Sequence, residues 1–212
     1  METAEQVNTS SKREVILDAA EHLFAESGFD KTTTRAIANK AKVNIAMLSY
    51  YFGSKEQLLY AVLERFSDGL AKVFSNIEES FATPEERLRN WIIAYVDYIF
   101  NHPNHARIVY RQVSVSSKRE DIVKLVSEFN KIRNIVLKAL NDGMESGKFN
   151  KVDAQLAITS ITAPVNAIVI ESNVMKHRLS INAPEGKLYP EEFKQRVKQH
   201  MIQMFESLVL PR

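Results

Sequence analysis

Apolar residues recur at helical spacing along the whole chain. In the first such segment they begin with Val15 and Ile16 and fall at i, i+1, i+4, i+5, i+8 and i+9. This spacing puts an apolar stripe on one face of a helix. No run alternates apolar and polar residues between turn residues, and the chain has only six Gly and six Pro. The pattern therefore predicts an all-α protein of about nine helices.

Capping residues predict where these helices begin and end. Gly28 follows the last apolar position of the first helix, and Asn44 precedes the third helix, so they are expected to be caps. Residues 1–9 precede the first apolar stripe and are predicted to form a disordered arm. The expected helices cover residues 10–27, 33–41, 45–51, 54–79, 83–102, 104–114, 116–147, 152–177 and 190–208.

The second and third of these helices are joined by the short turn Lys42–Asn44. Helices of about two turns are not stable alone, so the flanking helices 10–27 and 54–79 are expected to support them. Two short helices joined by such a turn form a helix-turn-helix, whose second helix lies in the major groove of DNA. We expect a DNA-binding domain at 10–56 and a second domain at 57–212, with helix 54–79 as a stiff connector.

The distribution of charge supports this interpretation. The chain carries a net charge of only +2, but residues 31–55 hold five basic side chains and no acidic one. Phosphate contacts require cations without competing anions nearby. An ordinary solvated surface is the alternative explanation for so few cations.

The run from Lys12 to Leu59 resembles the N-terminal domain of the tetracycline-repressor (TetR) family of bacterial transcription factors. The matching pieces, in order, are ILDAAEHLFAESGFDKTTTRAIANKAKVN, YYF and SKEQLL. The resemblance implies a homodimeric regulator, most often a repressor, that binds a palindromic DNA operator and responds to a small molecule. The alternative is a ligand-binding or scaffold protein of the same fold that has lost operator binding.

The resemblance also assigns candidate DNA contacts by position. It implies phosphate contacts from Thr34, Arg35, Tyr50 and Lys55. The candidates for base edges or the adjacent backbone are Asn44, Ile45, Ala46, Met47 and Ser49. The chain departs from the family pattern at Lys42, where glycine is common, and at Ser49, where tyrosine is frequent.

The C-terminal helices carry the remaining candidates. The resemblance implies an effector pocket for a largely apolar ligand in this region, and plain core packing is the alternative for the aromatic and apolar residues there. The candidate lining residues are Trp91, Tyr95, Tyr98, His102, Tyr110, Phe129 and Ile132. The segment 152–177 is apolar on nearly every side, which fits either a central helix of a monomer or a helix that also packs on a second subunit. In the family the last two helices form the dimer interface, which implies contacts from Ile161, Val165, Ile168, Val197, Met201, Met204 and Phe205.

Other function classes lack support in the sequence. There is no cysteine, phosphate-binding glycine loop, nucleophile elbow or cluster of metal-ligand residues, so we expect neither an enzyme nor a cofactor or metal. His102 and His105 straddle Pro103 and so do not share a continuous helical face. Polar residues interrupt the most apolar stretch, 156–174, which argues against a membrane span. Residues 1–9 lack an apolar targeting segment, so a cytoplasmic bacterial protein is expected.

Overall fold

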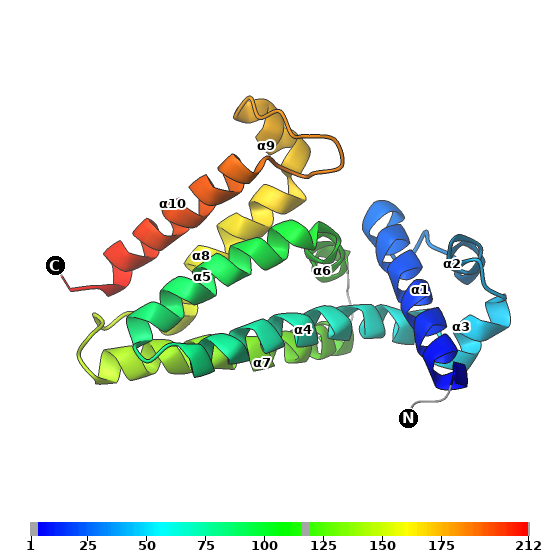
Figure 1. The fold of residues 1–212 in the computed structure, drawn as a ribbon, viewed down its shortest axis with the longest axis horizontal. Helices are drawn as coiled ribbons and strands as arrows, with labels where there is room; N and C mark the ends of the chain where they lie inside the picture. The colour runs from blue at the N-terminus through cyan, green and yellow to red at the C-terminus, as the bar shows by residue number, and fades with distance from the viewer. Residues whose placement is uncertain (1–3, 116–118, 212) are drawn as a thin grey trace. The chain divides into compact units, whose positions relative to one another are not determined.

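The computed structural model describes residues 4–115 and 119–211, with side chains for 12–112, 130 and 132–211. Its described part consists of α-helices and contains no strand, so the all-α prediction is confirmed (Figure 1). The elements are α1 (Ala4–Ser27), α2 (Thr34–Ala41), α3 (Ile45–Phe52), α4 (Lys55–Ser80), α5 (Pro84–Asn101), α6 (Pro103–Val115), α7 (Arg119–Glu145), α8 (Ala154–Ile170), α9 (Ser172–Arg178) and α10 (Glu191–Val209).

The chain divides into two compact units. The first contains the residues up to Phe66 together with Arg107–Glu128, and the second contains Ser67–Ala106 and Phe129–Arg212. The first unit thus extends past the expected boundary at residue 56 and takes in a later stretch. Helix α4 runs unbroken from Lys55 to Ser80 and contributes to both units, close to the predicted helix 54–79.

Helix α1 begins earlier than expected. Residues 4–9 were predicted to be part of a disordered arm, but they belong to α1, which starts at Ala4. The reason is local composition, because this stretch has no Gly or Pro and includes the helix formers Ala, Glu and Gln. The helix ends as predicted before Gly28, whose φ of +82° is one that glycine adopts without strain.

In the first unit, α2 packs on α1 and α3 packs on α2 (Figure 1). The short helices bury Ile37 and Leu48, which are 0% and 4% exposed. Buried Thr32 orders the loop before α2, since its hydroxyl donates to the carbonyls of Leu23 and Gly28 at 3.2 and 2.7 Å. Helix α1 therefore supports α2, as expected of one of the two flanking helices.

The second unit is built around α5, which packs against α8 and α10 (Figure 1). Thr83 caps α5 in a capping box with Glu86, and Pro84 is the first helical residue, close to the predicted helix start at residue 83. The expected single helix 152–177 is instead broken at Glu171 into α8 and α9, which are bent by 88°. Ser172 is 2% exposed at the break, so the bend lets the chain bury the start of α9.

None of the individual helices in the described residues is long and apolar enough to cross a membrane. Helices α8 and α9 meet the length and composition test only as a pair, across their 88° bend.

Candidate functional site

The N-termini of α2 and α3 are each capped by a side chain. Thr33 caps α2, and its hydroxyl accepts from the Ala36 N–H at 3.1 Å. Asn44 caps α3, and its Oδ1 accepts from the Ala46 N–H at 2.9 Å. Between them Lys42 adopts the left-handed conformation, with φ of +54°. Lys42 thus takes the strained position where glycine is common in the family.

Helix α3 presents one exposed face. Leu48 and Phe52 are buried, whereas Ile45 is 47% and Tyr50 is 80% exposed. Ala46 and Ser49 are exposed between them, which completes a face with spacing i, i+1, i+4 and i+5. Candidate contacts Ile45, Ala46, Ser49 and Tyr50 therefore share one surface. An eight-residue helix with such a face has the size and form of a major-groove reader.

The other candidate DNA contacts differ in how exposed their side chains are. Arg35 is exposed on α2, whereas Thr34 and Met47 are half-buried. Asn44 is exposed, but its side-chain oxygen is already engaged as the cap of α3. Asn44 is therefore not a free hydrogen-bonding partner for a base through that oxygen.

Lys55 does not have the free ammonium group expected of a phosphate contact. Its Nζ donates to the carbonyls of Phe29 and Thr32 at 2.9 and 3.0 Å and lies 4.2 Å from the centre of the Phe29 ring. Two of the three N–H groups of the Lys55 ammonium thus bond to the loop between α1 and α2. The sequence could not reveal this because the carbonyls lie 23 and 26 residues away along the chain.

The other four cations of residues 31–55 have exposed side chains. Lys31, Arg35, Lys40 and Lys42 are all exposed, and no acidic residue lies between positions 31 and 55. Sequence reasoning missed Arg13, whose guanidinium lies 5.3 Å from the centre of the Phe52 ring. It borders a surface hollow of about 320 Å³ beside Tyr51 and Gln57.

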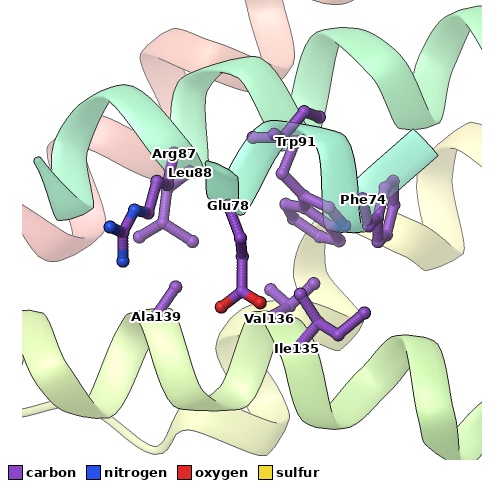
Figure 2. Close-up of a pocket in the computed structure, with 9 residues that line it drawn as sticks. Phe74, Glu78, Arg87, Leu88, Trp91, Ile135, Val136 and Ala139 are labelled. Carbon is purple, nitrogen blue, oxygen red and sulfur yellow. The ribbon is translucent and has the colours of Figure 1, made fainter. Parts of the chain in front are cut away.

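The second unit contains a small cavity between α4, α5 and α7, about 10 Å³ in volume. Figure 2 shows Glu78 directing its carboxylate toward α7, with Phe74 and Trp91 beside it. The lining residues are Phe74, Ile77, Glu78, Arg87, Leu88, Trp91, Ile135, Val136 and Ala139. Among the predicted effector-binding residues whose side chains are described, Trp91 is the one that lines this cavity. The other lining residues had no signal in the sequence beyond helical core spacing.

Tyr95 supports Trp91 from outside the cavity. The two rings stack with centres 5.8 Å apart, and the Tyr95 hydroxyl accepts a hydrogen bond from Asn166 at 3.0 Å. Burial raises the pKa of Tyr95 well above its ordinary value, so its phenol stays neutral across the physiological range. Tyr95 is thus a core residue that joins α5 to α8 and positions the indole.

The other effector candidates whose side chains are described do not line the cavity. Tyr98 packs against His102 with ring centres 4.5 Å apart, and His102 is the exposed C-cap of α5. Ile132 is core, at 7% exposed, and Tyr110 belongs to the first unit, where it is 57% exposed. The prediction for Phe129 falls outside the described side chains. Aromatic content alone did not distinguish core from lining residues.

Five residues expected at the dimer interface are instead buried within the subunit: Ile161, Val165, Val197, Met201 and Phe205. They face inward because α8 and α10 pack on each other and on α5. Ile168 and Met204 are half-buried. The outer face of α8 exposes a different set, including Leu156, Thr159, Ser160 and Ala163.

No group of three or more metal-ligand side chains gathers in the described part of the molecule. His102 and His105 lie with ring centres 6.0 Å apart, and His105 is 3% exposed.

Two family models match the chain. The model described as "Bacterial regulatory proteins, tetR family" matches residues 16–62, and "Tetracyclin repressor-like, C-terminal domain" matches residues 82–170. The first match covers the α2–turn–α3 region, and the second covers α5 and the cavity-lining part of α7.

Curated relatives and solved structures agree with these models. The transcriptional repressor KstR2 of Mycobacterium tuberculosis is 34% identical over 148 residues, which are 69% of this chain and 72% of KstR2. YttP of Bacillus subtilis, a probable transcriptional regulator, is 33% identical over 109 residues, and the match spans 53% of its length. The structure of KstR2 has a TM-score of 0.70 and 25% identity, covering 94% of this chain and 95% of that one.

A further structure, FadR from Bacillus subtilis in complex with stearoyl-CoA, has a TM-score of 0.70 and 23% identity, covering 89% of this chain and 97% of FadR. It shows the shared fold. The two family models and the match to KstR2 place the chain in the tetracycline-repressor family of bacterial transcriptional regulators, which are DNA-binding proteins and not enzymes.

Proposed function

We propose that this protein is a homodimeric repressor that binds a palindromic operator through α3 and is released by a small, largely apolar effector bound in the second unit. The observation that carries the DNA-binding part is the exposed face of Ile45, Ala46, Ser49 and Tyr50, in a stretch of sequence that has exposed cations and no carboxylates. Ile45 and Ala46 offer apolar contact to thymine methyl groups, while Ser49 and Tyr50 offer hydroxyl groups.

The outer face of α8 supports the homodimer. No charged residue occurs between Ala154 and Ile170, yet Leu156 is 65% exposed and Thr159, Ser160 and Ala163 are exposed beside it. A solvated helix face ordinarily carries charges, so an uncharged exposed face of this length fits a buried interface. Exposed Leu208 and half-buried Met204 on α10 offer further apolar contact. A two-fold dimer presents two copies of α3 and therefore selects a palindromic operator.

The lining of the cavity between α4, α5 and α7 supports an apolar effector, because six of its nine side chains are hydrocarbons. They are Phe74, Ile77, Leu88, Ile135, Val136 and Ala139. KstR2, the relative named above, is described as a ketosteroid transcriptional regulator. A ligand that binds the DNA-competent and the DNA-incompetent geometries with different affinity shifts the population between them.

The deciding experiment is binding of the purified protein to the promoter fragment of its own gene at several salt concentrations. Each phosphate neutralised contributes about −0.9 to the slope of log K against log salt. We expect a steep slope that Arg35→Ala reduces by about 1, and weaker binding in Tyr50→Ala. Lys187→Ala, which removes an exposed cation of the second unit, is the matched control and should bind as the wild type does.

Absence of binding at low salt, both to this fragment and to a random-sequence pool, would contradict the proposal. It would favour the alternative of a ligand-binding protein with the family fold. Lys55→Ala is unsuitable as a DNA-contact variant, because loss of its bonds to Phe29 and Thr32 perturbs the first unit itself.

A further inference from the structure

The indole of Trp91 is a buried donor without an acceptor. Its side chain is 4% exposed, and its Nε1 has no hydrogen-bond partner. A buried N–H that loses its bonds to water without gaining an internal one is destabilising, and such groups are rare in folded proteins. The residue also lines the cavity between α4, α5 and α7, where its ring stands beside Phe74 (Figure 2).

The cavity offers few polar partners to this group. Its other polar side chains are Glu78 and Arg87, and the Nε of Arg87 already donates to the Phe81 carbonyl at 2.7 Å. A buried water requires two to four polar partners, which these walls hardly supply. The Trp91 N–H is therefore available to donate a hydrogen bond to an acceptor atom on a bound ligand.

We infer that Trp91 Nε1–H donates a hydrogen bond to a neutral carbonyl group of the apolar effector, such as a thioester, ester or ketone carbonyl. This inference deepens the proposed function and rests on it. A free carboxylate is disfavoured because Glu78 directs its own carboxylate into the same small space (Figure 2). Two carboxylates in one apolar cavity repel each other, whereas a neutral carbonyl has no such cost.

The size of the cavity implies that it opens on binding. A volume of about 10 Å³ holds one water-sized sphere and no organic ligand. Ile135, Val136 and Ala139 of α7 form the wall opposite Trp91 and Glu78 (Figure 2). An apolar ligand displaces this wall and takes over its contacts, so binding is coupled to a shift of α7.

The chain provides a specific probe, because Trp91 is its only tryptophan. We would titrate the full-length protein with lauroyl-CoA, methyl laurate, laurate and free CoA, following Trp91 fluorescence and, separately, heat of binding. Lauroyl-CoA and methyl laurate carry neutral carbonyls on the same chain, whereas laurate carries a carboxylate. We expect the two neutral compounds to bind and change the emission, laurate to bind at least tenfold more weakly, and free CoA to leave the emission unchanged.

Two variants separate the hydrogen bond from the apolar contact. Trp91→Phe keeps an aromatic ring and removes the donor, so calorimetry should show roughly 3- to 10-fold weaker binding of methyl laurate. Tyr189→Phe is the matched control, because it removes a buried hydroxyl of the second unit that bonds to the Ile168 carbonyl and does not line the cavity. Glu78→Gln should raise laurate affinity and leave methyl laurate affinity within about twofold.

Each contrary result overturns the inference. One is a measurable heat of binding without any change in Trp91 emission, and another is equal affinity of the wild type and Trp91→Phe for methyl laurate. The others are laurate binding as tightly as methyl laurate, and no binding of either neutral compound. If Trp91→Phe fails to fold, the Glu78→Gln comparison decides, since Glu78 is only half-buried. The titrations need no DNA, so a failure of operator binding is detected separately from a failure of carbonyl recognition.

Discussion

At the scale of single residues, the backbone conformation of Lys42 lowers the stability of the fold. Lys42 ends α2 with φ of +54°, and the N–H groups of Lys42 and Val43 donate to the carbonyls of Asn39 and Ala38. A residue with a Cβ in this conformation costs about 1–2 kcal/mol, whereas glycine adopts it freely. The C-terminus of α2 therefore has its capping hydrogen bonds, but the left-handed conformation of Lys42 lowers the free energy of unfolding.

Lys42→Gly should stabilise the protein by about 0.5–1 kcal/mol, because relief of the left-handed strain exceeds the larger chain entropy of glycine. Urea unfolding followed by circular dichroism measures this change. The control is Lys40→Gly, another exposed lysine but inside α2, which should lose about 1 kcal/mol. Equal losses in both variants would show that Lys42 is not strained.

Gly69 in α4 is required by packing and not by flexibility. A Cβ at this position would lie 2.2 Å from the hydroxyl oxygen of Tyr98 on α5. Gly69→Ala should therefore destabilise the protein by about 1–2 kcal/mol, although alanine is the better helix former. In the Tyr98→Phe background the nearest atom is the ring carbon Cζ, at 3.3 Å, so the same change should be neutral or stabilising. Thermal unfolding of the four proteins tests this, and equal losses in both backgrounds would indicate a hinge role instead.

At the scale of elements, Arg65 joins α4 to α1 in the first unit. Its guanidinium nitrogens lie 3.0, 2.8 and 2.7 Å from carboxylate oxygens of Glu14, Asp18 and Glu21. One cation thus offsets three anions that share a face of α1. The Arg65 side chain is 28% exposed, so these ion pairs are only partly screened by solvent.

Arg65→Met should lower stability by about 1–2 kcal/mol, because it removes the cation that lies against all three carboxylates. Arg65→Lys keeps the charge but loses the forked geometry, so it should show a smaller loss. Urea unfolding at low and high salt measures both variants, and the difference between wild type and Arg65→Met should shrink as salt rises. A salt-independent difference would point to lost packing of the side chain instead.

At the scale of the whole molecule, the uncharged outer face of α8 predicts self-association. Leu156→Glu should weaken the dimer at least about tenfold, because a buried charge without a partner is costly, and operator affinity should fall with it. Leu179→Glu is the control, because Leu179 is also an exposed leucine, at 43%, but lies after α9. Sedimentation at several concentrations measures the dimer, and an unchanged dimer in Leu156→Glu would place the interface elsewhere.

The local sequence determined most of the secondary structure and the arrangement of the DNA-binding helices. Caps such as Thr33, Asn44 and the Thr83-Pro84 pair act through neighbours a few residues away, so their effects can be read from the chain alone. The exposed face of α3 follows equally from helical periodicity, since burying Leu48 and Phe52 exposes Ile45 and Tyr50.

Only the tertiary structure decided which side chains have free functional groups and which are already engaged. Lys55 bonds to carbonyls more than twenty residues away, and Ile161 and Val165 turn toward their own subunit, although their residue types fit the other roles equally well. The unpaired indole of Trp91 likewise depends on walls contributed by three separate helices. Helical periodicity determines that a face is apolar, but the partner of that face is set by contacts between segments distant in sequence.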